Sequence, residues 1–241
     1  MSVEADSHID IPPDHRLIVA LDVPNADAAR SLVEELGDAV QFYKIGLELS
    51  ASGSYFELLD WLVGQDKRVF ADLKLYDVPA TVAAAVRQIS NRGASFLTVH
   101  GDRPIMEAAA SEKGSLQILA VTVLTSMDNE DLRQMGIGLD VQSLVVQRAR
   151  LAMATGCDGV IASGLEAAQL RETLGPEAII VTPGIRPASG RTEDDQKRIV
   201  TPGQALEHGA SYIVVGRPIR NAPSPRQTAE AIQAEISASL Q

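Results

Sequence analysis

Short apolar stretches alternate along the chain with longer amphipathic ones. The apolar stretches are rich in valine, isoleucine and leucine and end in polar or glycine-containing turns, which is typical of buried strands. These predicted strands cover residues 16–22, 40–46, 68–74, 95–100, 116–124, 159–163, 178–183 and 211–216. Apolar residues at helical spacing predict helices at 26–36, 55–65, 79–92, 104–113, 141–155, 165–173, 202–208 and 225–239.

Eight strands that each precede a helix are the element count of an α/β protein with a (β/α)8 (TIM) barrel. The chain has 241 residues and shows no break in composition after its start. We therefore expect a single barrel domain at 16–241, preceded by a polar N-terminal lead at 1–15. An open, doubly wound sheet has the same alternation of elements, and periodicity alone does not decide whether the sheet closes.

Two connections are longer than the short loops that usually join such elements. Residues 126–140 include a polar stretch that predicts a short additional helix. Residues 184–200 are polar and contain glycine, and they follow the seventh predicted strand. In a barrel this loop lies at the corner where phosphate binds, so we expect a lid there.

Charge and cysteine content exclude several classes of function. The chain has 21 Lys and Arg against 32 Asp and Glu, a net charge of −11, and it has no basic run that would attract nucleic acid or an anionic membrane. Cys157 is the only cysteine, so no intrachain disulfide forms and no zinc-ligand spacing exists. With no signal-like N-terminus and no membrane-length apolar run, we expect a cytoplasmic protein.

The third predicted strand ends in an acidic and a basic residue. Because side chains alternate along a strand, Asp72 and Lys74 are expected to point to the same side. The C-terminal end of a barrel strand is where such proteins carry catalytic groups. Asp77 follows three residues later, where a turn could return it towards Lys74. A surface ion pair at a strand end explains Asp72 and Lys74 equally well when they are considered alone.

Other predicted strands bring further chemistry to the same mouth of the barrel. Asp22 ends the first strand and Lys44 lies near the end of the second, so charges of alternating sign converge. Gly216 and Arg217 end the eighth strand, where glycine permits close approach and arginine grips a phosphate with two hydrogen bonds. Arg186 lies just beyond the seventh strand. Packing alone does not explain why so many charged residues are expected at one mouth of the barrel.

Six short motifs occur in one order between about residues 16 and 220. They are LD at 21–22, YKIG at 43–46, DLKLYDVP at 72–79, TPGIR at 182–186, DQKR at 195–198 and VGRP at 215–218. Each motif is weak alone, but together they resemble the orotidine 5′-phosphate decarboxylase family. The resemblance implies a (β/α)8 barrel that converts orotidine 5′-phosphate to UMP without a cofactor or metal.

The resemblance also implies a role for each matching residue. Lys74 would protonate C6 of the pyrimidine, Asp72 would lie against the substrate carboxylate, and Lys44 would belong to the same charged set. Asp22 would bind the ribose hydroxyls or lie beside them, and Ser126 would contact the pyrimidine ring. Gln196, Gly216 and Arg217 would hold the phosphate, with Pro183 and Arg186 beside them in the substrate site.

A homodimer is implied by the same resemblance. In this family the residues that correspond to Asp77 and Thr81 enter the active site of the neighbouring subunit. The chain departs from the family pattern at Tyr76, where many members have histidine, and at residues 99–104, which lack the small-residue run often found there.

Two other functions are compatible with parts of this pattern. A magnesium-dependent sugar-phosphate decarboxylase or aldolase of the same barrel group would share Asp72, Lys74 and Asp77. It would need an acidic residue on the second strand, where this chain has Lys44, whose charge repels a metal ion. A non-catalytic nucleotide-binding barrel is the other alternative, although it has no evident use for carboxylates beside the ligand's own.

Overall fold

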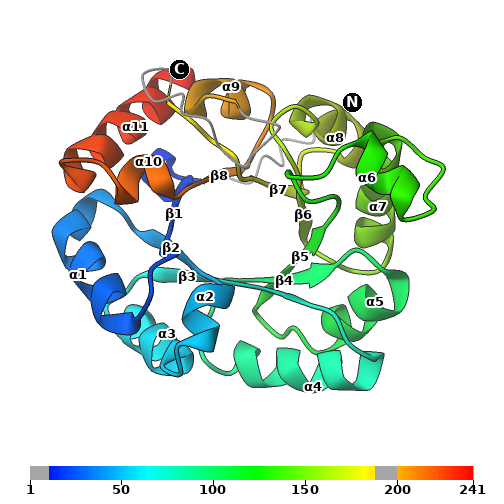
Figure 1. Cartoon of the computed structure of the whole chain (residues 1–241), viewed down its shortest axis with the longest axis horizontal. Helices are drawn as coiled ribbons and strands as arrows, with labels where there is room; N and C mark the ends of the chain where they lie inside the picture. The colour runs from blue at the N-terminus through cyan, green and yellow to red at the C-terminus, as the bar shows by residue number, and fades with distance from the viewer. Residues whose placement is uncertain (1–10, 188–199, 241) are drawn as a thin grey trace, which may run out of the picture.

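The computed structural model describes residues 11–187 and 200–240 and contains a closed barrel of parallel strands (Figure 1). The strands are β1 Leu17–Ala20, β2 Phe42–Ile45, β3 Arg68–Leu75, β4 Phe96–His100, β5 Gln117–Val121, β6 Gly159–Ile161, β7 Ile179–Thr182 and β8 Tyr212–Val215. Each strand pairs with the next, and β1 pairs with β8 through Leu17 and Ile213. This last pairing confirms the barrel and excludes the open sheet.

Helices surround the barrel on its outside (Figure 1). They are α1 Ala26–Leu36, α2 Leu47–Ala51, α3 Tyr55–Gly64, α4 Pro79–Ser90, α5 Arg103–Ser111, α6 Asn129–Gln134, α7 Val141–Ala154, α8 Ala167–Leu174, α9 Pro202–Glu207, α10 Arg217–Arg220 and α11 Pro225–Ser239, with 3-10 turns η1 Pro13–His15 and η2 Gly37–Ala39. The short α6 confirms the additional helix expected in the 126–140 connection. No described helix is both long and apolar enough to cross a membrane.

Local sequence signals account for the starts of several helices. Asn25 caps α1, because its side chain accepts a hydrogen bond from the backbone N–H of Ala28 at 2.9 Å. Pro79 and Pro202 occupy the first turns of α4 and α9, where the missing N–H costs nothing. The helices α2 and α10 were not predicted, because four or five residues are too few to show a helical period.

The apolar core has two parts. One lies between the strands and the surrounding helices, and the other fills the interior of the barrel. In the interior, the ring centroid of Phe96 lies 5.0 Å from that of Phe42 and 5.9 Å from that of Phe70. Ile11 joins this inner cluster, so the end of the polar N-terminal lead contributes to the barrel core. The filled interior supports the mouth of the barrel, where the strands end.

Candidate active site

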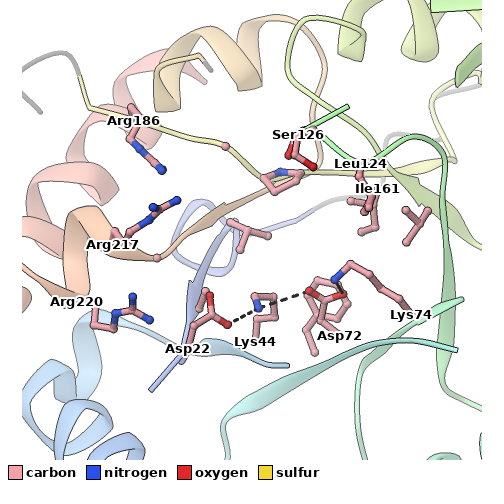
Figure 2. A pocket seen from close by; sticks show the side chains of 18 of the residues that line it. Asp22, Lys44, Asp72, Lys74, Leu124, Ser126, Ile161, Arg186, Arg217 and Arg220 are labelled. Atoms are coloured by element: carbon pink, nitrogen blue, oxygen red, sulfur yellow. Dashed lines mark hydrogen bonds and ion pairs between the residues drawn. The ribbon is translucent and has the colours of Figure 1, made fainter. Parts of the chain in front are cut away.

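A cavity of about 450 Å³ opens at the C-terminal ends of the strands (Figure 2). Nine of the predicted site residues line it, namely Asp22, Lys44, Asp72, Lys74, Ser126, Pro183, Arg186, Gly216 and Arg217. They come from segments that lie far apart in the sequence and meet only because the sheet closes. The volume fits a ligand the size of a nucleotide.

Four of these side chains form a continuous row of ion pairs, which we call the charged array. The Nζ atom of Lys44 donates a hydrogen bond to Oδ1 of Asp22 at 2.8 Å and lies 3.5 Å from Oδ2 of Asp72. The Nζ atom of Lys74 donates to Oδ1 of Asp72 at 2.7 Å. Figure 2 shows the row running across the floor of the cavity in the order Asp22, Lys44, Asp72, Lys74. Signs therefore alternate along it, as the sequence suggested.

The charged array keeps its two buried members ionised. Burial by itself lowers the pKa of Lys44, but the carboxylates of Asp72 and Asp22 outweigh it, and the pKa is raised. Burial by itself raises the pKa of Asp72, but the ammonium groups of Lys44 and Lys74 outweigh it, and the pKa is lowered. The side chain of Lys74 is more exposed to the cavity than either, at 28%. The Nζ donor of Lys74 thus faces the open space of the cavity.

The backbone of β3 is irregular just where the charged array forms. Ala71 pairs with Leu97 of β4, and the next registered pair is Leu75 with Val99, so three residues of β3 face one residue of β4. Within this bulge Lys74 has a φ of +48°, a left-handed conformation that costs an ordinary residue roughly 1–2 kcal/mol. Asp72 and Lys74 both line the cavity, as the sequence predicted. They reach this arrangement through a bulge and not through the regular two-residue alternation of a strand.

The opposite side of the cavity carries arginines. Figure 2 shows Arg186, Arg217 and Arg220 together at one end, away from Lys74. Arg186 is buried, and one of its Nη atoms donates to the backbone carbonyl of Ile185 at 2.8 Å. Guanidinium groups gathered at one end of a pocket suit a phosphate, which accepts several charge-assisted hydrogen bonds. The cavity therefore has an anion-binding end and an Asp/Lys end.

Three predicted site residues are not in this cavity. Asp77 and Thr81 are exposed, and Oδ1 of Asp77 accepts a hydrogen bond from the backbone N–H of Val78 at 2.6 Å. The expected return of Asp77 towards Lys74 in the same chain is therefore not observed. Gln196 lies outside the described residues, as does most of the predicted lid.

Sequence reasoning missed other residues of the site. Arg220 follows Arg217 by three residues on α10, a spacing that places two residues on one helix face and could have indicated it. Thr125 lines the cavity next to Ser126. Thr98 contacts the charged array from β4, and no pattern in the sequence distinguishes it from other strand threonines. The apolar walls, including Phe70 and Ile161, were predicted only as strand interior.

The side chains of the charged array suit a centre built on lysine ammonium groups better than one built on a metal ion. In residues 11–187 and 200–240, His, Cys, Asp and Glu side chains do not gather in groups of three or more that could ligate a metal ion. The carboxylates of Asp22 and Asp72 both contact the ammonium of Lys44. Lys44 therefore occupies the position that a bridging cation would need.

Fold and site together define the class: this is a (β/α)8-barrel enzyme whose cavity joins an anion-binding end to an Asp/Lys centre. The model of the orotidine 5′-phosphate decarboxylase / HUMPS family matches residues 15–232, and the chain belongs to that family. This membership confirms the resemblance carried by the six motifs.

Individual relatives are similar in sequence to this chain over nearly its whole length. The orotidine 5′-phosphate decarboxylase of Methylococcus capsulatus is 60% identical over 226 residues, covering 94% of this chain and 93% of the relative. That of Rhodopseudomonas palustris is 53% identical over 232 residues, covering 95% and 97%. The crystal structure of the Lactobacillus acidophilus enzyme superposes with a TM-score of 0.81 at 34% identity, covering 92% of this chain and 99% of that one.

Proposed function

We propose residue roles for the reaction that this chain catalyses, the decarboxylation of orotidine 5′-phosphate to UMP. The observation that carries the proposal is the charged array, in which the Lys74 ammonium is held 2.7 Å from Asp72 at the edge of the cavity. The arginines at the other end supply the binding site for the phosphate. No cofactor is needed in this account, because the chain's own charges do the work.

The chemistry requires a fixed positive charge and a ready proton. When the bond between C6 and the carboxylate carbon breaks, CO₂ departs and the electron pair stays on C6 in an sp² orbital. The Lys74 ammonium stabilises that pair electrostatically and then donates a proton to C6, which gives UMP and a neutral amine that water reprotonates. Asp72 holds the ammonium in place, and its charge lies beside the substrate carboxylate that is lost.

The two ends of the cavity fix the orientation of the substrate. With the phosphate at Arg186, Gly216 and Arg217, and Pro183 beside it, the ribose is directed to Asp22. The family resemblance adds Gln196, which lies outside the described residues, as a further phosphate ligand. The pyrimidine then reaches the Lys74 end, where Ser126 can contact the ring. Binding energy from the phosphate thereby positions a carbon at the other end of the molecule.

The alternatives explain less of the site. A magnesium-dependent sugar-phosphate enzyme needs a free carboxylate pair, but the carboxylates of Asp22 and Asp72 are already bridged by Lys44. A barrel that merely binds nucleotides gains nothing from Asp72, which would repel the carboxylate of the ligand. Placing Asp72 beside the ligand carboxylate is useful only if the reaction removes that carboxylate.

We also propose that the active protein is a homodimer with shared sites. Asp77 and Thr81 are exposed at the rim of the barrel, and Tyr76 and Val78 on either side of Asp77 expose 66% and 63% of their surface. Large exposed apolar groups beside charged ones are typical of an interface. Asp77 would complete the partner's charged array. A reducing compartment, the cytoplasm, suits the free and buried Cys157.

The role of Lys74 is tested by the Lys74→Ala variant. We expect turnover, followed by the ultraviolet absorbance change from orotidine 5′-phosphate to UMP, to fall by at least about 10³-fold, because both the proton donor and the fixed charge are lost. UMP binding, measured by calorimetry, should survive. Turnover near that of the wild type would remove Lys74 from this role.

The shared site is tested by mixing two inactive variants, Lys74→Ala and Asp77→Ala. If Asp77 serves the partner's site, a mixed dimer has one site that lacks both residues and one site that is intact. Activity should therefore rise towards half of the wild-type value per mixed dimer. A mixture that stays inactive, although sedimentation shows that the subunits exchange, would contradict shared sites.

A further inference from the structure

Thr98 lies at the centre of β4 and touches the charged array from outside the cavity. Its side chain is fully buried and is not among the groups that line the cavity. The Oγ1 atom accepts a hydrogen bond from the backbone N–H of Lys74 at 2.9 Å and donates one to Oδ1 of Asp72 at 2.9 Å. A single hydroxyl therefore joins the backbone of one array member to the carboxylate of another.

The register of the sheet explains why a side chain takes this position. Three residues of β3, 72–74, face one residue of β4, and that residue is Thr98. A bulge of this kind removes backbone groups from the regular ladder, and a buried N–H that loses its partner is unfavourable. The Thr98 hydroxyl supplies the acceptor that Lys74 needs at a φ of +48°.

The directions of these two hydrogen bonds are coupled. A backbone N–H can only donate, so Lys74 uses a lone pair of the Thr98 oxygen. The one hydroxyl proton is then free to point at Asp72, whose Oδ1 also receives the Nζ–H of Lys74 at 2.7 Å. Two donors on one carboxylate oxygen fix the rotation of that carboxylate.

We propose that Thr98 is a positioning residue that sets the Lys74 ammonium and the Asp72 carboxylate at their working separation. The inference rests on the proposed role of the charged array. Without the hydroxyl, the bulge loses the acceptor that holds Lys74 in its left-handed conformation, and Asp72 loses one of the donors that orient it. The ammonium then points less accurately at C6, and small errors of position in a proton donor are costly.

Three substitutions separate positioning from simple packing. Thr98→Val keeps the shape and removes the hydroxyl, whereas Thr98→Ser keeps the hydroxyl and removes a methyl group. Thr182→Val is the matched control, because Thr182 is equally buried at the end of β7 and its hydroxyl has no hydrogen-bond partner among the residues that the structure describes. Thr98→Ala repeats the loss of the hydroxyl if the valine variant does not fold.

The measurement is kcat and KM for orotidine 5′-phosphate, with Tm and UMP affinity for every variant. Thr98→Val should lower kcat by about 10- to 100-fold, the loss expected from one hydrogen bond to a charged group, while KM and UMP affinity change by less than about threefold. Thr98→Ser should recover most of kcat, and Thr182→Val should match the wild type.

Two outcomes would overturn the inference while the wild type remains active. One is a Thr98→Val enzyme with wild-type kcat, and the other is a serine variant as impaired as the valine variant, which would indicate packing. Failure of the proposed function looks different, since the wild type itself would then not convert orotidine 5′-phosphate.

Discussion

At the N-terminal end of the barrel interior, the guanidinium carbon of Arg68 lies 4.3 Å from the ring centroid of Phe42 and within 5.5 Å of those of Phe96 and Tyr212. One of its Nη atoms also donates to the Tyr212 hydroxyl at 3.3 Å. At the C-terminal end the charged array is held by ion pairs instead. Both ends bring charge into the same barrel, but one surrounds it with rings and the other pairs it with opposite charge.

The difference separates stability from function. Ring faces attract a cation from several sides and keep it within the protein, so the contacts of Arg68 stabilise the closed barrel. The charged array ends in Lys74, which faces the cavity from a strained bulge. Unusual backbone geometry of this kind tends to occur where a fold carries out chemistry. Changes at the two ends should therefore have different consequences.

Of the changes that compare the two ends of the barrel, Lys44→Met should have the largest effect, because it breaks the charged array. Removing this ammonium leaves the carboxylates of Asp22 and Asp72 without their bridge, and we expect a loss of about 3 kcal/mol in unfolding free energy. kcat should fall by at least about 10²-fold, because Asp72 loses one of its two ammonium partners and no longer holds Lys74 in the same position. Denaturant unfolding and the absorbance assay check both. A variant as active and as stable as the wild type would contradict the role that we assign to the charged array.

Arg68→Met should affect stability alone. The variant keeps an apolar side chain among the rings but loses the cation, so we expect about 2 kcal/mol less stability with kcat and KM unchanged. Denaturant unfolding and steady-state kinetics provide the measurement. A fall in kcat comparable to that of Lys44→Met would mean that the two ends are not separate.

Arg220→Gln should produce a smaller change at the anion-binding end. The Arg220 side chain lines the cavity, and within residues 11–187 and 200–240 one of its buried Nη atoms has no hydrogen-bond partner. If it reaches the phosphate, KM should rise about 10-fold while kcat stays constant, since one charge-assisted hydrogen bond is lost. The nucleoside orotidine, which lacks the phosphate, is the control and should be insensitive. Equal effects on both substrates would contradict this role.

The smallest effect should be the response of the charged array to moderate pH. The pKa of Asp72 is lowered, so its contribution to stability is present above about pH 4 and is lost as the pH falls through that lowered pKa. The pKa of Lys44 is raised, so its contribution is full below about pH 10 and is lost as the pH rises through that raised pKa.

The stability difference between the wild type and Lys44→Met should therefore stay level from about pH 5 to 9 and shrink on either side. Chemical denaturation across this range measures it. The difference for Arg68→Met should not shrink in acid, because that arginine contacts rings and a phenol hydroxyl. A difference that slopes through neutral pH would contradict these pKa directions.

Much of the fold was predictable because the relevant signals are local. The bounds of α1 and α11 agree with the predicted helices residue for residue, and all eight strands lie within one residue of the predicted segments or inside them. The position of the site was predictable because the C-terminal ends of parallel barrel strands lie at the same mouth. Asp22, Lys44 and Arg217 do line one cavity there.

The remainder depends on geometry that no local pattern encodes. A strand period predicts that Asp72 and Lys74 share a side but contains no sign of the bulge that moves Lys74. The role of Thr98 follows only from the register between β3 and β4. Spacing alone allowed a turn to return Asp77 towards Lys74 of the same chain, but Asp77 is exposed and does not line the cavity.

The most direct test of the account is turnover of orotidine 5′-phosphate by the wild type in the presence of a chelator. Since Lys44 bridges the carboxylates and no metal takes part in the proposed reaction, the absorbance change to UMP should proceed at the same rate with and without the chelator. An enzyme that leaves orotidine 5′-phosphate unchanged, and whose activity on a keto-sugar phosphate disappears with the chelator, would contradict it.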